Sequence, residues 1–176
     1  MTRALLLAVA LAAAAPAQEV VAIDSRVLTF VPSRDDLTVG KAVVSIHAER
    51  PQQVRLDGKP LPEAWHLLEL ERVGPNRFAL PPLRLEAPAG ELVCLSVKVW
   101  FAEVDNRWDG LFYEQLDDRY ALVAWSTRTD GPGWERARAR FAQNRVDTLD
   151  QLRERLSRPF PIALNRRPLS AAREPR

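Results

Sequence analysis

Cysteine is nearly absent from this chain of 176 residues, which carries Cys94 alone. A single cysteine excludes an intrachain disulfide, and it excludes zinc sites that are built on Cys-x-x-Cys pairs. A chain of this length buries enough surface to fold without such cross-links. We therefore expect an ordinary hydrophobic core rather than a scaffold held by disulfides or metal ions.

Histidine and clustered glycine are also scarce. Only His47 and His66 could serve as imidazole bases, and the chain has no Gly-x-Ser-x-Gly elbow. The glycines come no closer together than Gly131-Pro132-Gly133, which excludes the usual phosphate-binding and dinucleotide-binding loops. The single methionine is Met1, so a copper site with an axial methionine lacks that ligand. These absences favour a protein that is not an enzyme, and we assign no catalytic residue.

Lysine is the third scarce residue: only three of the 25 basic residues are Lys, which is typical of a GC-rich coding sequence. Arg clusters therefore say little about partners, and we expect no nucleic-acid ligand. The charge nevertheless divides by region, with a net charge of −5 over residues 18–133 and of +6 over residues 134–176. This division predicts that the basic tail docks on its own acidic domain, or that it meets an anionic partner.

Long hydrophobic runs are limited to one, at the N-terminus. Arg3 precedes an unbroken run of Ala, Leu and Val over 4–14, and Ala15-Pro16-Ala17 has the small-x-small pattern that signal peptidase cleaves. The run is shorter than the ~20 residues that span a bilayer. We therefore expect residues 1–17 to be a cleaved signal peptide, and the mature protein to be periplasmic or secreted and not membrane-spanning.

Alternation of apolar and polar residues dominates the mature chain. The alternating stretches occupy 41–48, 52–57, 92–104 and 119–128. This period, bounded by glycine and proline turns, predicts antiparallel strands with one buried face, and Asp57-Gly58 is expected to turn the chain. The two longest stretches are predicted as central strands, with Leu95, Val97 and Val99 in the core. Residues 62–73 fit either a helix or a strand hairpin, and we favour the hairpin.

After Gly133 the apolar spacing changes to that of helices. Two short amphipathic helices are expected over roughly 134–143 and 148–157, with Asp147 as the N-cap of the second and Pro159 as its stop. The predicted organisation is therefore a signal peptide (1–17), a β-sandwich (18–133), a helical extension (134–158) and a basic, flexible tail (159–176).

Short strands followed by helices predict a mainly β protein, an antiparallel β-sandwich with a short C-terminal α-helical extension. Part of the chain resembles bacterial Ig-like modules. The resemblance rests on Val54-Arg55-Leu56-Asp57-Gly58-Lys59-Pro60-Leu61, Arg77-Phe78-Ala79-Leu80, Leu83-Arg84-Leu85 and Gly90-Glu91-Leu92. It covers less than half of the mature chain, and it implies an Ig-like fold rather than an activity.

Acidic residues are concentrated between Glu103 and Asp118. Hard cations such as Ca²⁺ need several oxygen ligands from one flexible loop, so Glu103, Asp105 and Asp109 are candidate metal ligands. The stretch does not match an EF-hand, because Arg107 and Leu116 stand where two of the ligands belong. The alternative is a solvated acidic loop that joins two strands.

Aromatic residues lie near the same segment. The candidate binding residues are Trp100, Trp108, Tyr113 and Trp125. Aromatic rings beside carboxylates are suited to stacking on a sugar, while tryptophan is also a common core residue.

Three functions follow as hypotheses. The first is an exported, non-enzymatic β-sandwich module that binds or scaffolds another protein or a cell-envelope component. The second is a Ca²⁺-assisted carbohydrate-binding module, and the third is a small hydrolase that uses carboxylates from the acidic segment. Outside the calcium of the second hypothesis, no cofactor is expected.

Overall fold

A computed structural model describes residues 17–102, 113–114, 120–128, 130–133, 135–136, 144–163 and 167–168. The strands are β1 (Gln18–Ile23), β2 (Arg26–Pro32), β3 (Val39–Ala48), β4 (Arg55–Leu56), β5 (Lys59–Pro60), β6 (Trp65–Glu69), β7 (Glu71–Gly74), β8 (Arg77–Leu80), β9 (Leu83–Pro88), β10 (Val93–Phe101), β11 (Tyr113–Glu114), β12 (Tyr120–Ser126), β13 (Phe160–Ile162) and β14 (Arg167–Pro168). The helical elements with defined bounds are the short 3₁₀ turn η1 (Pro51–Gln53) and α2 (Leu149–Leu156).

The first sheet has the strand order β12-β10-β3-β6, and all of its pairs are antiparallel. The expected central strand over 92–104 is β10, which pairs with β3 on one side and β12 on the other. Its inward side chains Leu95, Val97 and Val99 are buried, as the alternation predicts. The opposite face of β10 is buried as well, because Cys94 and Ser96 are each less than 4% exposed.

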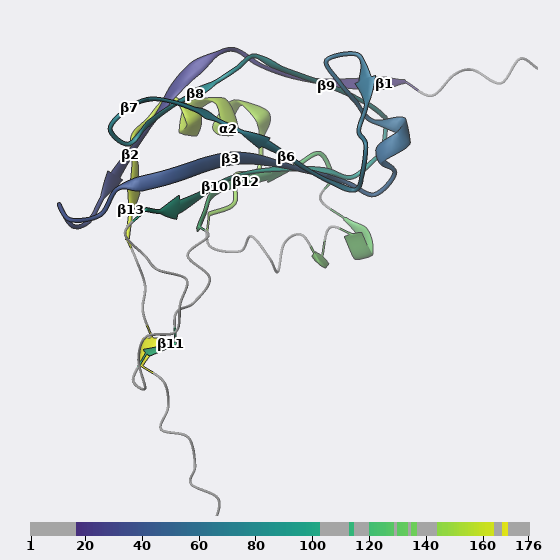
Figure 1. The fold of residues 1–176 in the computed structure, drawn as a ribbon. Helices are drawn as coiled ribbons and strands as arrows, with labels where there is room; N and C mark the ends of the chain where they lie inside the picture. The colour runs from purple at the N-terminus through teal and green to yellow at the C-terminus, as the bar shows by residue number, and fades with distance from the viewer. Residues whose placement is uncertain are drawn as a thin grey trace, which may run out of the picture.

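The second layer is a long ribbon that bends in the middle (Figure 1). The pair β1–β9 and the pair β2–β8 share one register, which runs from Gln18 opposite Pro88 to Thr29 opposite Arg77. The ladder is interrupted where Pro81-Pro82 joins β8 to β9, because proline has no N–H to donate to a neighbouring strand. Strands β4 and β5 extend one half of the ribbon, and β7 and β13 flank the other half.

Residues 62–73, which fitted either a helix or a hairpin, are extended. Strand β6 pairs with β3 in the first sheet, and β7 pairs with β8 in the second sheet through a turn at Asn76, whose φ is 53°. Leu70 lies between β6 and β7 and is buried. The chain therefore crosses from one sheet to the other here, and Leu70 fills the core at the crossing.

The expected turn at Asp57-Gly58 is present, and it joins β4 and β5 in a hairpin. Both residues have positive φ, 50° for Asp57 and 81° for Gly58, which is the backbone of a type I′ turn.

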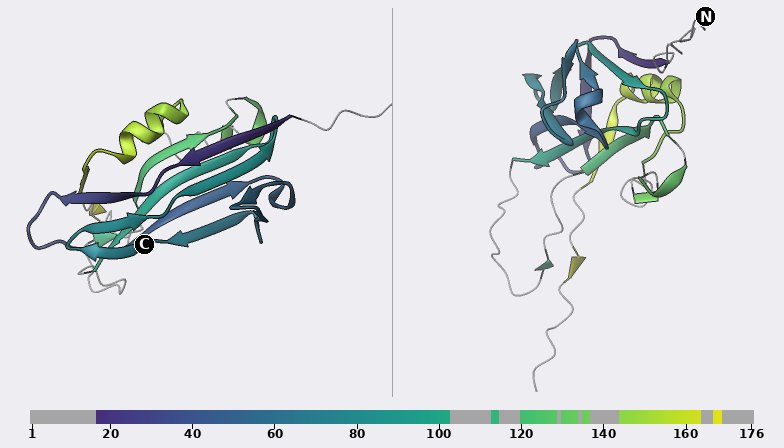
Figure 2. Two further views of the ribbon diagram at one scale, coloured as in Figure 1. Left: turned by 90° about the horizontal axis from the view of Figure 1, so that it is seen from above. Right: turned by 90° about the vertical axis from the view of Figure 1, so that its right-hand side faces the viewer.

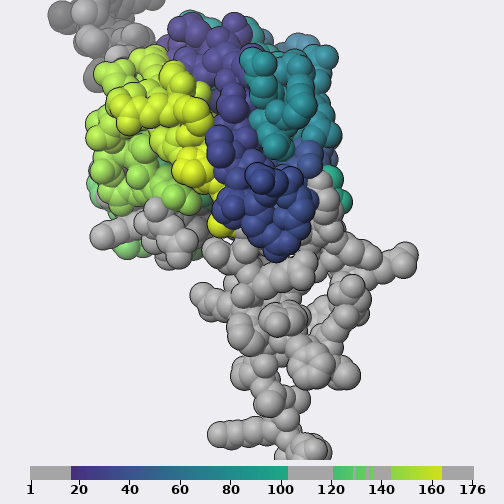
Figure 3. All heavy atoms as spheres, turned by 90° about the vertical axis from the view of Figure 1, so that its left-hand side faces the viewer, coloured from purple at the N-terminus to yellow at the C-terminus, as the bar shows by residue number. Residues whose placement is uncertain are grey.

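Helix α2 closes the sandwich on the side away from β6. Thr148, rather than the expected Asp147, caps its N-terminus in a capping box with Gln151. Leu152 and Leu156 are buried between the two layers, where a space of only about 10 Å³ remains among them and the strands. That space is too small for a ligand. Figures 2 and 3 show α2 and the following strand lying directly against the N-terminal strands.

Strand β13 lies within the segment that the sequence assigns to a flexible tail. It pairs in parallel with β2, and Phe160 is completely buried, with its ring centroid 5.5 Å from that of Phe30. The β14 residues farther along pair with β11. The first predicted helix, over 134–143, falls mainly outside the described residues.

The predicted fold class is confirmed: the protein is mainly β, with antiparallel sheets packed as a sandwich and a short helix near the C-terminus. Its likeness to Ig-like modules stays an expectation from the sequence.

Candidate functional site

The four aromatic residues predicted to bind a ligand are not seen to form one platform. Trp125 is 7% exposed and belongs to the hydrophobic core. Trp100 is half-buried on β10. Tyr113 lies in β11, but its side chain is outside the described part of the structure, and Trp108 is outside it entirely. Trp125 therefore has the core role that the sequence left as an alternative.

The candidate metal ligands Glu103, Asp105 and Asp109 lie outside the described residues. Within the described ranges, no group of three or more His, Cys, Asp or Glu side chains is placed to hold a metal ion. The Ca²⁺ site stays a prediction.

Cys94 and His47 are directly opposite each other on neighbouring strands, β10 and β3. Burial raises the pKa of the Cys94 thiol, which outweighs the opposing effect of a hydrogen bond with Ser126. A nucleophilic cysteine needs the opposite shift, because the thiolate is the reactive form. The ring of His47 packs on that of Trp65 at 4.2 Å between centroids. This pair therefore has the environment of a structural cysteine rather than a catalytic one.

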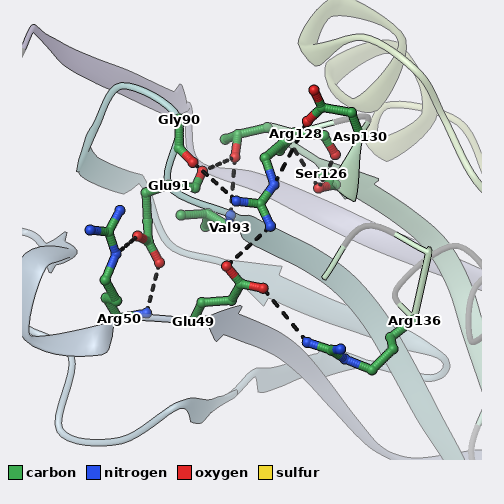
Figure 4. Close-up of polar contacts among 10 residues, drawn as sticks. Glu49, Arg50, Gly90, Glu91, Val93, Ser126, Arg128, Asp130 and Arg136 are labelled. Atoms are coloured by element: carbon green, nitrogen blue, oxygen red, sulfur yellow. Dashed lines mark hydrogen bonds and ion pairs between the residues drawn. The ribbon is translucent and has the colours of Figure 1, made fainter. Parts of the chain in front are cut away.

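A polar network joins three segments at one end of the sandwich (Figure 4). The Glu91 carboxylate is fully buried and accepts two hydrogen bonds from Arg50, one from its backbone N–H at 2.7 Å and one from its Nε at 2.6 Å. A buried carboxylate is tolerated only when it is paired in this way. The pair fixes the start of η1 against the turn that precedes β10.

Glu49 holds the chain that follows β12. Arg128 donates to the Glu49 carboxylate at 3.1 Å and to the Gly90 carbonyl at 3.3 Å, and Arg136 lies 3.8 Å from the other Glu49 oxygen. Gly133 packs so closely that a Cβ there would overlap the Glu49 carboxylate. These contacts give the charged cluster a structural role, which is to hold the chain after β12 against Glu49.

A second feature of the surface is formed by β6 and β7. Strands β6 and β7 are each the last strand of their sheet, and they follow one another in the chain. In the part of the chain that the structure describes, β6 and β7 are terminal strands of different sheets, and we call residues 65–74 the β6–β7 edge. Figure 2 shows β6 at the margin of the first sheet.

Backbone hydrogen bonds show which β6 groups are turned outward. The Leu70 N–H donates to the Ala42 carbonyl at 3.0 Å, and the Ala64 carbonyl accepts from Ala48 at 3.0 Å, so these even-numbered residues are bonded to β3. An antiparallel strand alternates its bonding direction at every residue. The N–H and C=O groups of Trp65, Leu67 and Glu69 are consequently directed away from β3.

The side chains of the β6–β7 edge include large apolar groups in contact with solvent. Trp65 is 37% exposed, Leu67 is 56% exposed, and Val73 is 46% exposed. An edge strand with open backbone groups and apolar side chains is a template for pairing with another strand, and proteins usually protect such edges. Here Glu69 and Glu71 are the charged residues at the middle of the edge.

A hollow of about 420 Å³ lies beside these two carboxylates. Its lining consists of Ser25, Arg26, Val27, Glu69, Glu71, Ala79, Leu80 and Pro81. The Arg26 guanidinium is bonded to the Arg153 carbonyl and the Ser157 hydroxyl of the C-terminal helix, at 2.8 and 2.9 Å. Glu69 forms an exposed ion pair with Lys41 at 2.8 Å. We call this feature the Glu69–Glu71 hollow.

Trp65 and Leu67 are not among the binding residues predicted from the sequence. A signal was present, because residues 65–71 alternate as Trp-His-Leu-Leu-Glu-Leu-Glu, with apolar residues on both faces at the start of the strand. Whether such a strand is central or terminal depends on the order of the strands in the sheet, and the sequence did not reveal that order.

A comparison of the chain with protein-family models, curated proteins and solved structures finds no match. None of the helices in the described ranges is long and apolar enough to cross a membrane.

Proposed function

We propose that this protein is an exported, non-enzymatic binding module that holds an extended segment of another protein along the β6–β7 edge. The observation that carries the proposal is the outward direction of the backbone N–H and C=O groups of Leu67 and Glu69. A partner strand satisfies these groups by main-chain hydrogen bonds, which is the usual mode of strand addition to a sheet edge.

The exposed side chains supply the rest of the interaction. Directly opposite residues of an antiparallel pair lie close enough for their side chains to pack, so an added strand covers Trp65 and Leu67 on one face. Aromatic residues are enriched in protein interfaces because they bury a large area at a low entropic cost. The proposal includes export because residues 1–17 have the sequence pattern of a signal peptide.

The test is a selection of binding peptides from a displayed library of random decapeptides, with residues 18–176 as the target. The affinity of the enriched peptides is then measured by fluorescence anisotropy for the wild type and two variants. Leu67→Pro removes the outward N–H without touching the β3 ladder, and proline is tolerated at such edge positions. Leu67→Thr keeps the N–H and serves as the matched control.

Peptides that bind the wild type and Leu67→Thr, but lose at least tenfold in affinity for Leu67→Pro, support the proposal. Equal binding by all three proteins, or no enrichment at all, contradicts it. Circular dichroism is used to check that Leu67→Pro is folded. Should it unfold, protection of the Leu67 amide from hydrogen exchange by the bound peptide is the deciding measurement in the wild type.

A further inference from the structure

We infer that the segment bound at the β6–β7 edge is a basic one, and that it places a Lys or Arg side chain at the Glu69–Glu71 hollow. This inference rests on the proposed function and names the chemistry of its partner. It follows from the carboxylates of the edge, the shape of the hollow and the geometry of an antiparallel pair.

Exposed carboxylates lie at the middle of the edge. Lys41 pairs with Glu69 at 2.8 Å, whereas Glu71 forms no ion pair in the part of the chain that the structure describes. Arg72 is exposed as well, but its guanidinium donates to the Val39 carbonyl at 3.1 Å and lies 5.9 Å from the centre of the Phe78 ring. At the Glu71 carboxylate a positively charged side chain is therefore favoured over an acidic one.

The hollow suits a long basic side chain in particular. Val27 and Ala79 face each other in the β2–β8 pair and, with Pro81, give the hollow an apolar wall, while Glu69 and Glu71 provide its carboxylates. Lys and Arg side chains bury an apolar stem while their charged ends stay at a polar group or in water. Arg can also bond a carboxylate with two parallel N–H groups.

The position of the basic residue is set by the register. A strand antiparallel to β6 meets Glu69 first, then Leu67 and then Trp65. Side chains directly opposite these residues lie on the same outer face of the sheet, two residues apart in the partner. The partner segment therefore reads, from its N-terminus, basic–any–apolar–any–apolar.

A second copy of this chain fits the edge less well. Two β6 strands paired antiparallel about Leu67 place Trp65 of each copy opposite Glu69 of the other. A second copy therefore brings no cation to either Glu69 carboxylate, and the two-fold symmetry repeats this mismatch. The edge is therefore better suited to a different, basic chain.

The experiment uses two acetylated and amidated peptides with residues 18–176 of the protein. The first is Thr-Arg-Thr-Val-Thr-Val-Thr, and the second has Glu in place of Arg. Affinities are measured by chemical-shift titration at low ionic strength and again in 0.5 M NaCl. The proteins are the wild type, the double variant Glu69→Gln/Glu71→Gln, the control Glu19→Gln on β1, and Leu67→Pro.

We expect the wild type and Glu19→Gln to bind the Arg peptide roughly three- to tenfold more tightly than the Glu peptide, because an attractive charge pair is replaced by a repulsive one. The preference falls in 0.5 M NaCl, because salt screens exposed charges. In Glu69→Gln/Glu71→Gln it disappears, while weaker binding of both peptides persists.

The outcomes separate the two proposals. If the wild type binds both peptides equally and Leu67→Pro binds neither, the basic anchor is wrong and the edge remains the binding site. If neither peptide binds, or if Leu67→Pro binds as well as the wild type, the proposed function itself fails. Sedimentation velocity tests the second copy. If the wild type dimerises and Leu67→Pro does not, the edge binds a second copy of this chain, and the inference is overturned.

Discussion

Replacement of Phe160 by alanine tests how far the C-terminal segment is part of the core. Phe160 has no exposed surface, its ring lies against Phe30, and the Arg155 guanidinium is 4.2 Å from its centroid. Removal of a buried phenylalanine side chain costs about 3–5 kcal/mol, from lost transfer free energy and the cavity that remains. For a domain of this size, each kcal/mol lowers the melting temperature by about 2–4 °C. The expected decrease is therefore on the order of 10 °C.

The assay is urea unfolding followed by circular dichroism, together with a thermal melt. The matched control is Arg158→Ala, two residues earlier, which removes an exposed ion pair with Glu154. Exposed ion pairs contribute little, so the control should lie within about 0.5 kcal/mol of the wild type. A change of less than 1 kcal/mol for Phe160→Ala would refute the reasoning, because it would show that β13 is not seated on β2.

Three further predictions concern other parts of the chain. Gly133→Ala should destabilise the fold by about 1 kcal/mol in urea unfolding, because the added Cβ displaces the Glu49 carboxylate from Arg128; Gly74→Ala, whose nearest contact is 3.7 Å away, should have little effect. Because burial raises the pKa of the Cys94 thiol, the unfolded chain loses this proton first as the pH rises above about 8.5. The free energy of unfolding should therefore fall with rising pH there, more steeply in the wild type than in Cys94→Ala, and equal slopes would contradict the buried thiol. Mass spectrometry of the native protein should find Gln18 as the first residue, and a chain that begins at Met1 would exclude signal cleavage.

Much of the fold could be predicted from local sequence. The alternation around Leu95, Val97 and Val99 predicted the central strand β10, because side chains of a strand repeat every two residues. Asp57-Gly58 predicted the turn between β4 and β5, because few residues tolerate positive φ. The spacing of Leu149, Leu152 and Leu156 identified α2. Each of these signals depends only on residues within one element.

The remaining features depend on how distant elements meet. Phe160 follows a proline in a basic segment, and its burial requires β2, which lies about 130 positions earlier in the chain. The two buried faces of β10 likewise depend on what covers Cys94 and Ser96. The candidate site was missed for the same reason, since the exposure of Leu67 follows from the terminal position of β6 in its sheet.

Hydrogen exchange at single amides of β6 tests the central claim most directly. In the free protein, the amides of His66, Leu68 and Leu70 should be protected, while those of Leu67 and Glu69 exchange rapidly. A selected peptide at saturating concentration should protect the second set and leave the first unchanged. Protection of both sets in the free protein, or binding that leaves the second set exposed, would contradict the claim that this edge receives a partner strand.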